Sequence, residues 1–251
     1  MAQYTALILA AGYGSRIADI TENPKSLLMV NGKPLMDWHF EAWKSVGIRN
    51  VVVVTGYKRD VLESYLEKFK SDFDIHFAVN EDFRVKGNTY SFYYGLEKTH
   101  GDFLLFDADL IYDTAILKRF LEDKSPNQIL VGESSIDDIE CAKAMLDKDG
   151  FVRMTIDKRA VTEEERTRFT FAGEAVGILK FSKNYRDDML AACKSFLAEE
   201  KNISKNWEHV MNEFLLNHDM NIHRTINNRW VEIDNKEDLE KAKGLFEGMP
   251  R

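Results

Sequence analysis

The chain has 251 residues, of which 44% are hydrophobic and 30% are charged, and its formal net charge is −8. This length and composition are typical of a globular α/β protein and argue against an intrinsically disordered chain. The negative net charge opposes binding to nucleic-acid backbones, because both partners would carry the same sign. Any anionic ligand must therefore be held by a local group of basic side chains.

The sequence also argues against a membrane segment, because no uninterrupted apolar run approaches roughly 20 residues. The first residues lead into an apolar strand without a basic leader, so we expect a cytoplasmic protein. Cys141 and Cys193 are isolated, which predicts neither a disulfide nor a zinc site. The oligomeric state stays open between a monomer and a homodimer.

The first half of the chain alternates strands with helices. Apolar runs predict strands at 5–11, 51–55, 75–80 and 102–109, and helical spacing predicts helices at 34–46, 58–69 and 88–98. This alternation favours a parallel sheet with helices on both faces, whose ligands bind beyond the carboxyl ends of the strands. The functional motifs should gather at that edge.

Beyond residue 109 the pattern changes to strands with less helix between them. We expect strands at 128–133, 142–147, 151–157, 174–181 and 230–234, and helices at 184–199, 205–218 and 236–246. A turn signal at 147–150 predicts a hairpin, and the charged segment 158–168 predicts a mobile loop or a short helix. The predicted fold is α/β: a Rossmann-like mixed, mostly parallel sheet with helices on both faces and a small antiparallel extension, in one domain of residues 1–251.

A glycine-rich turn follows the first strand, in the segment LAAGYGSR at 9–16, and NPKSL follows at 23–27. Glycines let backbone N–H groups approach phosphate oxygens, while Arg16 and Lys25 supply positive charge. The segment departs both from the GxxxxGK[ST] loop and from a GxGxxG followed by an acidic ribose-binding residue. It predicts a phosphate-binding site of another class.

This segment resembles the GxGxR...PK signature of the nucleotidyltransferase family that activates sugar phosphates and phosphoalcohols, and the order of elements is similar over most of the chain. The resemblance implies that Arg16 and Lys25 are catalytic cations. It also implies that the nucleotide contacts a set of residues around the first strands and the helix at 88–98: Leu9, Ala10, Ala11, Gly12, Gly14, Ser15, Tyr57, Asn80, Gly87, Asn88 and Ser91. An alternative for Asn88 and Ser91 is that they satisfy N–H groups at a helix start.

Two pairs of acidic residues alternate along predicted strands. Asp107 and Asp109 end the strand at 102–109, and Glu232 and Asp234 lie in WVEID at 230–234. Side chains two apart share a face of a strand, and paired carboxylates suit Mg²⁺. The family resemblance implies that Asp107 and Asp234 are catalytic and hold Mg²⁺ on the triphosphate. An alternative for Asp234 is that it caps the helix that follows.

The resemblance implies attack of an acceptor phosphate or phosphonate oxygen on the α-phosphorus of the nucleotide, with release of pyrophosphate. An anionic nucleophile needs no general base, so catalysis consists of positioning and charge neutralisation. The short chain and the segment NTYSFYY at 88–94 are similar to cytidylyltransferases acting on phosphocholine or 2-aminoethylphosphonate. The expected substrates are therefore CTP and a small amine-bearing acceptor.

Six residues are candidates for binding the acceptor. Lys158 is expected at the phosphorus oxygens, and the amine is expected near Glu174, Trp207, Glu208, Trp230 and Glu232. Carboxylates suit a primary ammonium, whereas an aromatic cage suits trimethylammonium, and the carboxylates tip the balance slightly toward the aminophosphonate. An alternative is that the tryptophans belong to the core and the charged residues are solvated.

Two other functions stay open. One is a sugar-1-phosphate nucleotidyltransferase that uses UTP or dTTP, with the same chemistry and another acceptor. The other is a catalytically silent nucleotide-binding regulator, which is disfavoured because Arg16, Lys25, Asp107 and Asp234 are all present.

Overall fold

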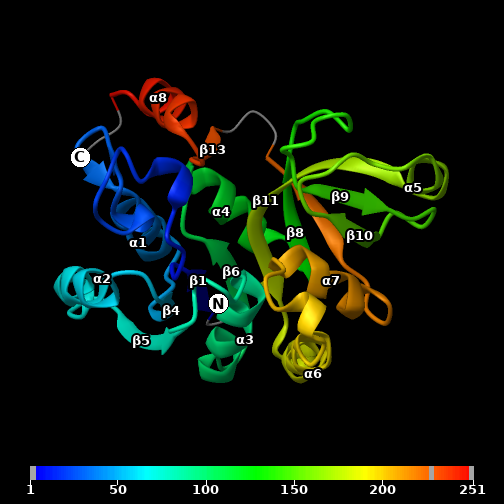
Figure 1. Cartoon of the computed structure of the whole chain (residues 1–251), viewed down its shortest axis with the longest axis horizontal. Helices are drawn as coiled ribbons and strands as arrows, with labels where there is room; N and C mark the ends of the chain where they lie inside the picture. Colours follow the sequence, from blue (N-terminus) through cyan, green and yellow to red (C-terminus); the bar gives the residue numbers. More distant parts are fainter. Residues whose placement is uncertain (1–3, 226–228, 249–251) are drawn as a thin grey trace.

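The computed structural model describes residues 4–225 and 229–248, so residues 1–3, on which the expected absence of a leader partly rests, lie outside it. The main sheet has nine strands (Figure 1). Seven follow the order β10–β9–β11–β6–β1–β4–β5, while β8 pairs with β11 and β12. The strands of this sheet are β1 (Thr5–Leu9), β4 (Asn50–Thr55), β5 (Asp74–Val79), β6 (Phe103–Asp107), β8 (Gln128–Gly132), β9 (Lys143–Leu146), β10 (Val152–Ile156), β11 (Thr170–Phe181) and β12 (Asn221–Arg224).

Two small sheets and the helices complete the described fold. The small sheets are β2 (Met29–Val30) with β3 (Lys33–Pro34), and β7 (Leu110–Tyr112) with β13 (Trp230–Glu232). The α-helices are α1 (Leu35–Ser45), α2 (Arg59–Leu66), α3 (Asn88–Lys98), α4 (Thr114–Glu122), α5 (Glu163–Arg168), α6 (Arg186–Leu197), α7 (Trp207–Leu215) and α8 (Lys236–Leu245). None of the described helices is long and apolar enough to cross a membrane.

The parallel half of the sheet is buried on both faces. β1 pairs in parallel with β4 and β6, and β4 pairs in parallel with β5. Leu7 and Leu9 belong to a core cluster that includes side chains of α3, α6 and α7. Ala6 and Ile8 belong to a second cluster with side chains of α1, α2 and α4. The alternation of side chains along one strand thus serves two helical layers, and the predicted fold class is confirmed.

The antiparallel extension is built on the long strand β11. It pairs antiparallel with β6, β8 and β9, and β9 pairs antiparallel with β10. The predicted hairpin between β9 and β10 is confirmed by a backbone hydrogen bond from Asp147 N to Phe151 O of 2.9 Å. In Figure 1, β9, β10 and α5 project on the side of the molecule opposite α2 and β5.

Several elements differ from the sequence prediction. The strand expected at 102–109 ends at Asp107, because residues 108–109 turn into β7. The strand expected at 230–234 ends at Glu232, because Asn235 and Asp238 form the capping box that starts α8. That capping box also excludes the alternative in which Asp234 is the helix cap. The sequence prediction missed α4, β12 and the β2–β3 pair.

The packing of α3 on the sheet requires a glycine at position 95. A Cβ on Gly95 would lie 2.9 Å from Val54 Cγ2 and closer still to Leu7 Cδ1, so α3 would have to move away from β1 and β4. We predict that Gly95→Ala lowers the free energy of unfolding by about 1–3 kcal/mol, measured by chemical denaturation.

Gly244, in α8, is the matched control, because a Cβ there would meet nothing within 4 Å. Gly244→Ala should leave stability unchanged or raise it by about 0.5–1 kcal/mol. Equal effects of the two substitutions would contradict the close packing of α3.

Candidate active site

A cavity of 280 Å³, called the first cavity below, lies at the carboxyl ends of β1 and β6. It is lined by residues from along the whole described chain: Leu9, Ala10, Ala11, Gly12, Gly14, Arg16, Lys25, Ser26, Asn88, Ser91, Asp107, Ala108, Asp109, Asp157, Lys158, Asn206, Glu208, Glu232 and Asp234. The sequence analysis placed the site at this edge of the sheet, and the cavity brings most of the predicted nucleotide residues together there.

The glycine-rich turn reaches the cavity through a left-handed residue. Gly14 has φ 66° and ψ 48°, and its carbonyl accepts from Ile17 N at 3.1 Å. A Cβ on Gly14 would lie 3.2 Å from Lys25 Cβ, so the glycine permits both the turn and the close approach of Lys25. Arg16 and Lys25 therefore both line the first cavity.

Four predicted nucleotide residues, Ser15, Tyr57, Asn80 and Gly87, are absent from the described lining of the first cavity. Tyr57 and Asn80 each form a hydrogen bond with a residue that does line the cavity. Tyr57 N donates to Ala11 O at 3.0 Å, and Asn80 Nδ2 donates to Ser91 Oγ at 3.1 Å. Gly87 N donates to Ile203 O at 2.8 Å.

Asn88 begins α3 and also ties that helix to α7. Its Oδ1 accepts from Trp207 N at 2.6 Å, and neither Asn88 nor Ser91 is the N-cap of α3, which is Gly87. Asn88 therefore satisfies the first N–H of α7, as the alternative for this residue expected of a helix start, and both Asn88 and Ser91 line the first cavity.

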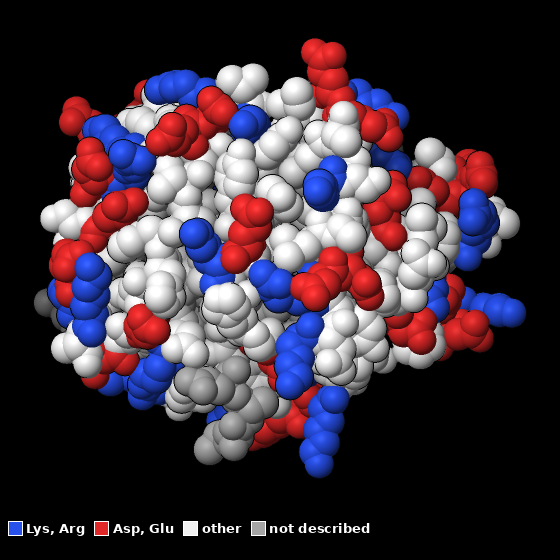
Figure 2. Space-filling view, turned by 90° about the horizontal axis from the view of Figure 1, so that it is seen from below, with Lys and Arg blue, Asp and Glu red and all other residues white. Residues whose placement is uncertain are grey.

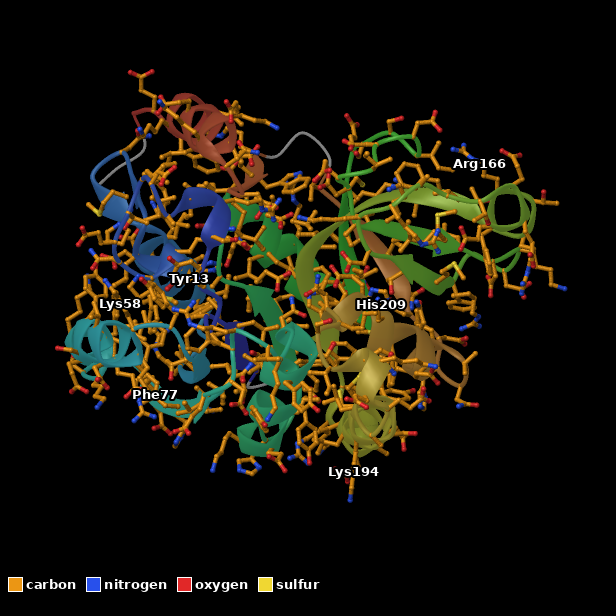
Figure 3. All side chains as sticks on the ribbon, in the orientation of Figure 1. Tyr13, Lys58, Phe77, Arg166, Lys194 and His209 are labelled. Atoms are coloured by element: carbon orange, nitrogen blue, oxygen red, sulfur yellow. The ribbon has the colours of Figure 1, made fainter. Side chains whose placement is uncertain are left out.

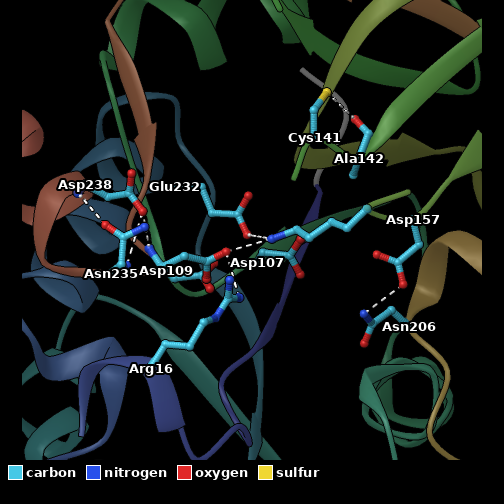
Figure 4. Close-up of polar contacts among 12 residues, drawn as sticks. Arg16, Asp107, Asp109, Cys141, Ala142, Asp157, Asn206, Glu232, Asn235 and Asp238 are labelled. Atoms are coloured by element: carbon cyan, nitrogen blue, oxygen red, sulfur yellow. Dashed lines mark hydrogen bonds and ion pairs between the residues drawn. The ribbon is translucent and has the colours of Figure 1, made fainter. Parts of the chain in front are cut away.

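Asp234 is the meeting point of the charged side chains. Its carboxylate contacts Arg16 at 2.8 Å, Lys25 at 2.8 Å and Lys158 at 2.6 Å, and Lys25 also contacts Asp109 at 2.6 Å. Figure 4 shows Arg16, Asp109 and Glu232 converging on this point. Burial opposes ionisation of Asp234, but the charge of Lys25, together with Lys158, outweighs it and holds the pKa of the carboxyl well below its usual range.

Three carboxylates lie close enough to share one cation. Ligand oxygens of Asp109, Glu232 and Asp234 lie within 4.8 Å of one another. The antiparallel pairing of β7 with β13 causes this proximity, and Ile233 N donates to Asp109 O at 3.0 Å. Asp109 Oδ1 is buried without a hydrogen-bond partner. An all-oxygen donor set with an unpaired buried oxygen fits a hard divalent cation.

The electrostatics of Glu232 agree with such a cluster. Burial, followed by the charges of Asp109 and Asp234, raises the pKa of Glu232 to about 7. The sequence analysis assigned Glu232 to the acceptor. The structure places it in the carboxylate cluster and in the walls of the first cavity and of a second one, and its contact with the acceptor stays a prediction.

Asp107 lies in the first cavity but outside this cluster of three. Its Oδ2 accepts from Trp207 Nε1 at 3.1 Å, and burial, then the charge of Asp109, raises its pKa. Trp207 itself is 1% exposed and packs in the core, so it reaches the site only through its indole N–H. The pairing of Asp107 with Asp234 on a metal stays a prediction.

A second cavity of 330 Å³ adjoins the first, and the two share Arg16, Lys158, Glu232 and Asp234 in their walls. Its remaining lining is strongly acidic and includes one aromatic ring: Glu133, Asp138, Glu140, Cys141, Glu174, Trp230, Val231, Asn235, Asp238 and Lys241. The structure therefore gathers Lys158, Glu174, Trp230 and Glu232, four of the predicted acceptor residues.

Glu208 does not line the second cavity but lines the first, together with Lys158 and Glu232. It is 7% exposed, its Oε2 has no hydrogen-bond partner, and burial, followed by the charge of Asp157, raises its pKa well above the usual range. An unpaired buried carboxyl oxygen in a cavity wall can accept a hydrogen bond from a ligand.

Five residues that line the first cavity were not among the predicted site residues: Ser26, Ala108, Asp109, Asp157 and Asn206. The first three lie within or beside the motifs singled out in the sequence, whereas Asp157 and Asn206 lie outside them. Asn206 Nδ2 donates to Asp157 Oδ2 at 3.0 Å, and His209 Nε2 lies 3.3 Å from the same carboxylate (Figure 4 shows Asp157 and Asn206). Asp157 ends the predicted strand at 151–157 and precedes Lys158, and this position is the signal by which it could have been found. Asn206 carried no comparable signal.

The comparisons with known proteins agree with this geometry. Residues 6–196 match the model of the MobA-like NTP transferase domain, and the chain therefore belongs to that family of nucleotidyltransferases.

Two relatives of this chain are cytidylyltransferases, and one solved structure shares its fold. The chain is 27% identical to a CTP:phosphoglutamine cytidylyltransferase from Campylobacter jejuni over 94% of this chain and 97% of the relative. It is 34% identical to a choline-phosphate cytidylyltransferase from Streptococcus pneumoniae over 41% of this chain and 44% of the relative. The structure of a CTP:phosphocholine cytidylyltransferase from Streptococcus pneumoniae superposes with a TM-score of 0.77 at 21% identity, covering 98% of this chain and all of that one.

The position of Asp107 depends on Gly177 in β11. Gly177 has φ 78°, and a Cβ there would lie 2.5 Å from Asp107 Oδ2. We predict that Gly177→Ala costs roughly 1–2 kcal/mol of stability through its left-handed backbone and lowers turnover on the order of 100-fold by displacing the carboxylate.

Gly150→Ala is the control, since Gly150 has φ 85° and open space around it. It should cost similar stability in thermal denaturation and keep full turnover. Similar turnover in both variants would show that Asp107 tolerates displacement.

Proposed function

We propose that the protein is a magnesium-dependent cytidylyltransferase that transfers CMP from CTP to a small amine-bearing phosphate or phosphonate and releases pyrophosphate. The observation that carries the proposal is the meeting of three basic residues with a carboxylate cluster where two cavities join. The first cavity is lined by most of the residues predicted to bind the nucleotide, and the lining of the second cavity is rich in acidic residues. Such a junction can align a triphosphate with a second phosphorus-bearing substrate.

The basic residues supply the charge that both substrates need. Arg16, from the glycine-rich turn, and Lys25, from the segment 23–27, line the first cavity, where a triphosphate would lie. Lys158 lines both cavities. Lys25 and Lys158 are held protonated. Burial lowers the pKa of each ammonium, but nearby carboxylates outweigh this effect and raise it. These carboxylates are Asp109 and Asp234 for Lys25, and Glu232 and Asp234 for Lys158. In-line attack on the α-phosphorus then requires positioning and neutralisation rather than a general base.

The carboxylates give the proposed metal its place. Asp109, Glu232 and Asp234 would hold Mg²⁺, and Asp107 lies in the wall of the same cavity. When bound, the ion supplies neutralisation of charge on the triphosphate oxygens. Arg16, Lys25 and Lys158 contact Asp234 in the structure, so the phosphate groups of the substrates would replace carboxylates as partners of these cations.

The second cavity favours an acceptor with a primary ammonium. Its lining combines Glu133, Asp138 and Glu174 with the single aromatic ring of Trp230, and carboxylates rather than an aromatic cage recognise N–H groups. 2-Aminoethylphosphonate fits this chemistry better than phosphocholine. The phosphoglutamine of the Campylobacter relative adds a third candidate that also combines a phosphorus group with nitrogen functions.

The first experiment measures Mg²⁺-dependent pyrophosphate release while crossing five nucleotides with five acceptors. The nucleotides are CTP, UTP, ATP, GTP and dTTP; the acceptors are phosphocholine, phosphoethanolamine, 2-aminoethylphosphonate, phosphoglutamine and glucose-1-phosphate. We expect turnover with CTP and an amine-bearing acceptor. Turnover only with the sugar phosphate and UTP or dTTP would establish the alternative enzyme, and no turnover in any combination would favour the silent regulator.

A second experiment tests the metal role of the carboxylates. Asp109→Asn and Asp234→Asn should each lower turnover on the order of 100-fold and raise the Mg²⁺ concentration for half-maximal rate, since a metal supplies several kcal/mol of charge stabilisation. Asp107→Asn tests the pair that the family resemblance implied, and we expect it to lose metal-dependent turnover while staying folded.

Asp72→Asn is the control, because Asp72 forms a surface pair with Lys44. It should leave both the rate and the Mg²⁺ titration unchanged. If Asp109→Asn behaves like Asp72→Asn, the cluster of Asp109, Glu232 and Asp234 does not hold the metal.

A further inference from the structure

A fully buried lysine lies behind the second cavity. Lys143, on β9, is 0% exposed, and its Nζ donates to the carbonyl oxygens of Asp138 at 2.5 Å, Cys141 at 2.8 Å and Arg159 at 3.0 Å. An ammonium group has three N–H donors, so each donor has one carbonyl acceptor. Complete satisfaction offsets the large cost of burying a charge.

The three carbonyls belong to two segments that form the wall of the second cavity. Asp138 and Cys141 lie in the loop between β8 and β9, and both line that cavity. Arg159 follows Lys158, which lines both cavities. One ammonium therefore joins the acidic loop to the segment that carries the proposed phosphate-binding lysine.

The backbone of Lys158 needs such support. Lys158 has φ 27°, a left-handed conformation that costs energy in a residue with a Cβ. The carbonyl of the next residue accepts from Lys143, and the Arg159 guanidinium contacts Glu165 of α5 at 2.6 Å. A strained backbone persists only where its surroundings hold it, and here two charged contacts fix the peptide that follows.

Side chains of α5 also contact both the loop between β8 and β9 and the segment that follows Lys158. Arg166 of α5 contacts Asp137 in the loop between β8 and β9, and Figure 3 places Arg166 at the far end of the antiparallel extension. Arg166 is half-buried but Asp137 is exposed, so this pair is screened by solvent and contributes little. The buried ammonium of Lys143 is the stronger connection.

We propose that Lys143 is a positioning residue for the acceptor: it holds Lys158 and the loop at 138–141 in the arrangement that binds the phosphorus group and its amine-bearing substituent. This inference rests on the proposed function. A long apolar side chain at position 143 could fill the same space, but it could not bind the three carbonyls. The ammonium therefore serves the geometry of the cavity rather than packing alone.

The test compares two buried lysines. Lys143→Met keeps the length of the side chain and removes the ammonium, and we expect the acceptor KM to rise on the order of 100-fold while the CTP KM changes less than about twofold. Lys180→Met is the matched control: Lys180 is 2% exposed, its Nζ donates to Asp123 O at 2.6 Å, and it pairs with Leu104 near the start of β6, at the opposite end of the strand from the site. It should lose stability without changing either KM.

Hydrogen exchange provides a readout that does not depend on the proposed reaction. In Lys143→Met the amides at 138–141 and 158–161 should exchange faster by about tenfold or more, because their carbonyl anchors are lost, whereas Lys180→Met should leave these segments unchanged. Unchanged exchange there would overturn the positioning role whether or not turnover is found. If these amides exchange faster in Lys143→Met but the wild-type protein shows no turnover, the proposed function is refuted and the positioning role of Lys143 in the loops is not.

Two further outcomes decide the inference. Equal losses of kcat in both variants, with the acceptor KM unchanged, would show that Lys143 is only structural. If Lys143→Met does not fold, Lys143→Gln replaces it, because its amide keeps two of the three N–H donors. An acceptor KM that stays at the wild-type value in Lys143→Gln, together with unchanged exchange at 158–161, would then overturn the proposal.

Discussion

The site depends on one carboxylate that joins three distant parts of the chain. Asp234 follows β13 and contacts Arg16 from the glycine-rich turn, Lys25 from the segment 23–27 and Lys158 from the antiparallel extension. The protein carries a net charge of −8, so it cannot rely on long-range attraction to gather an anionic substrate. It concentrates basic groups locally, and the carboxylates at the same point keep those groups in place.

The pairing of β7 with β13 fixes this carboxylate. It brings Asp109, at the end of the β6 turn, beside Glu232 and Asp234 near the end of the chain, while the capping box of Asn235 and Asp238 starts α8 immediately afterwards. Because the strand and the cap leave little freedom, the carboxylates can form one oxygen-rich cluster. The same arrangement places them between the two cavities, where a triphosphate and an acceptor would meet.

The two cavities differ in how much of their lining lies in the region that the family model matches. The first is built on the parallel core and the glycine-rich turn, which match the MobA-like NTP transferase model across residues 6–196. The second is built on the antiparallel extension, which lies within the matched range, and on residues 230–241, which lie beyond it. On the face shown in Figure 2, basic and acidic side chains are intermixed, so the strongest separation of charge described here lies within the site rather than over that face.

The sequence alone determined the fold class and the edge of the sheet where the site lies. Strand and helix periods, the turn at Gly14 and the pair Arg16 and Lys25 depend on local dihedral angles and spacing, which the order of residues specifies. Tertiary structure alone decided that Asp109 and Glu232 join Asp234, that Trp207 is buried, and that Lys143 binds two loops. Lys25 meets Asp109 across 84 residues of sequence and Asp234 across 209, and such contacts follow from strand pairing and packing, which local spacing does not specify.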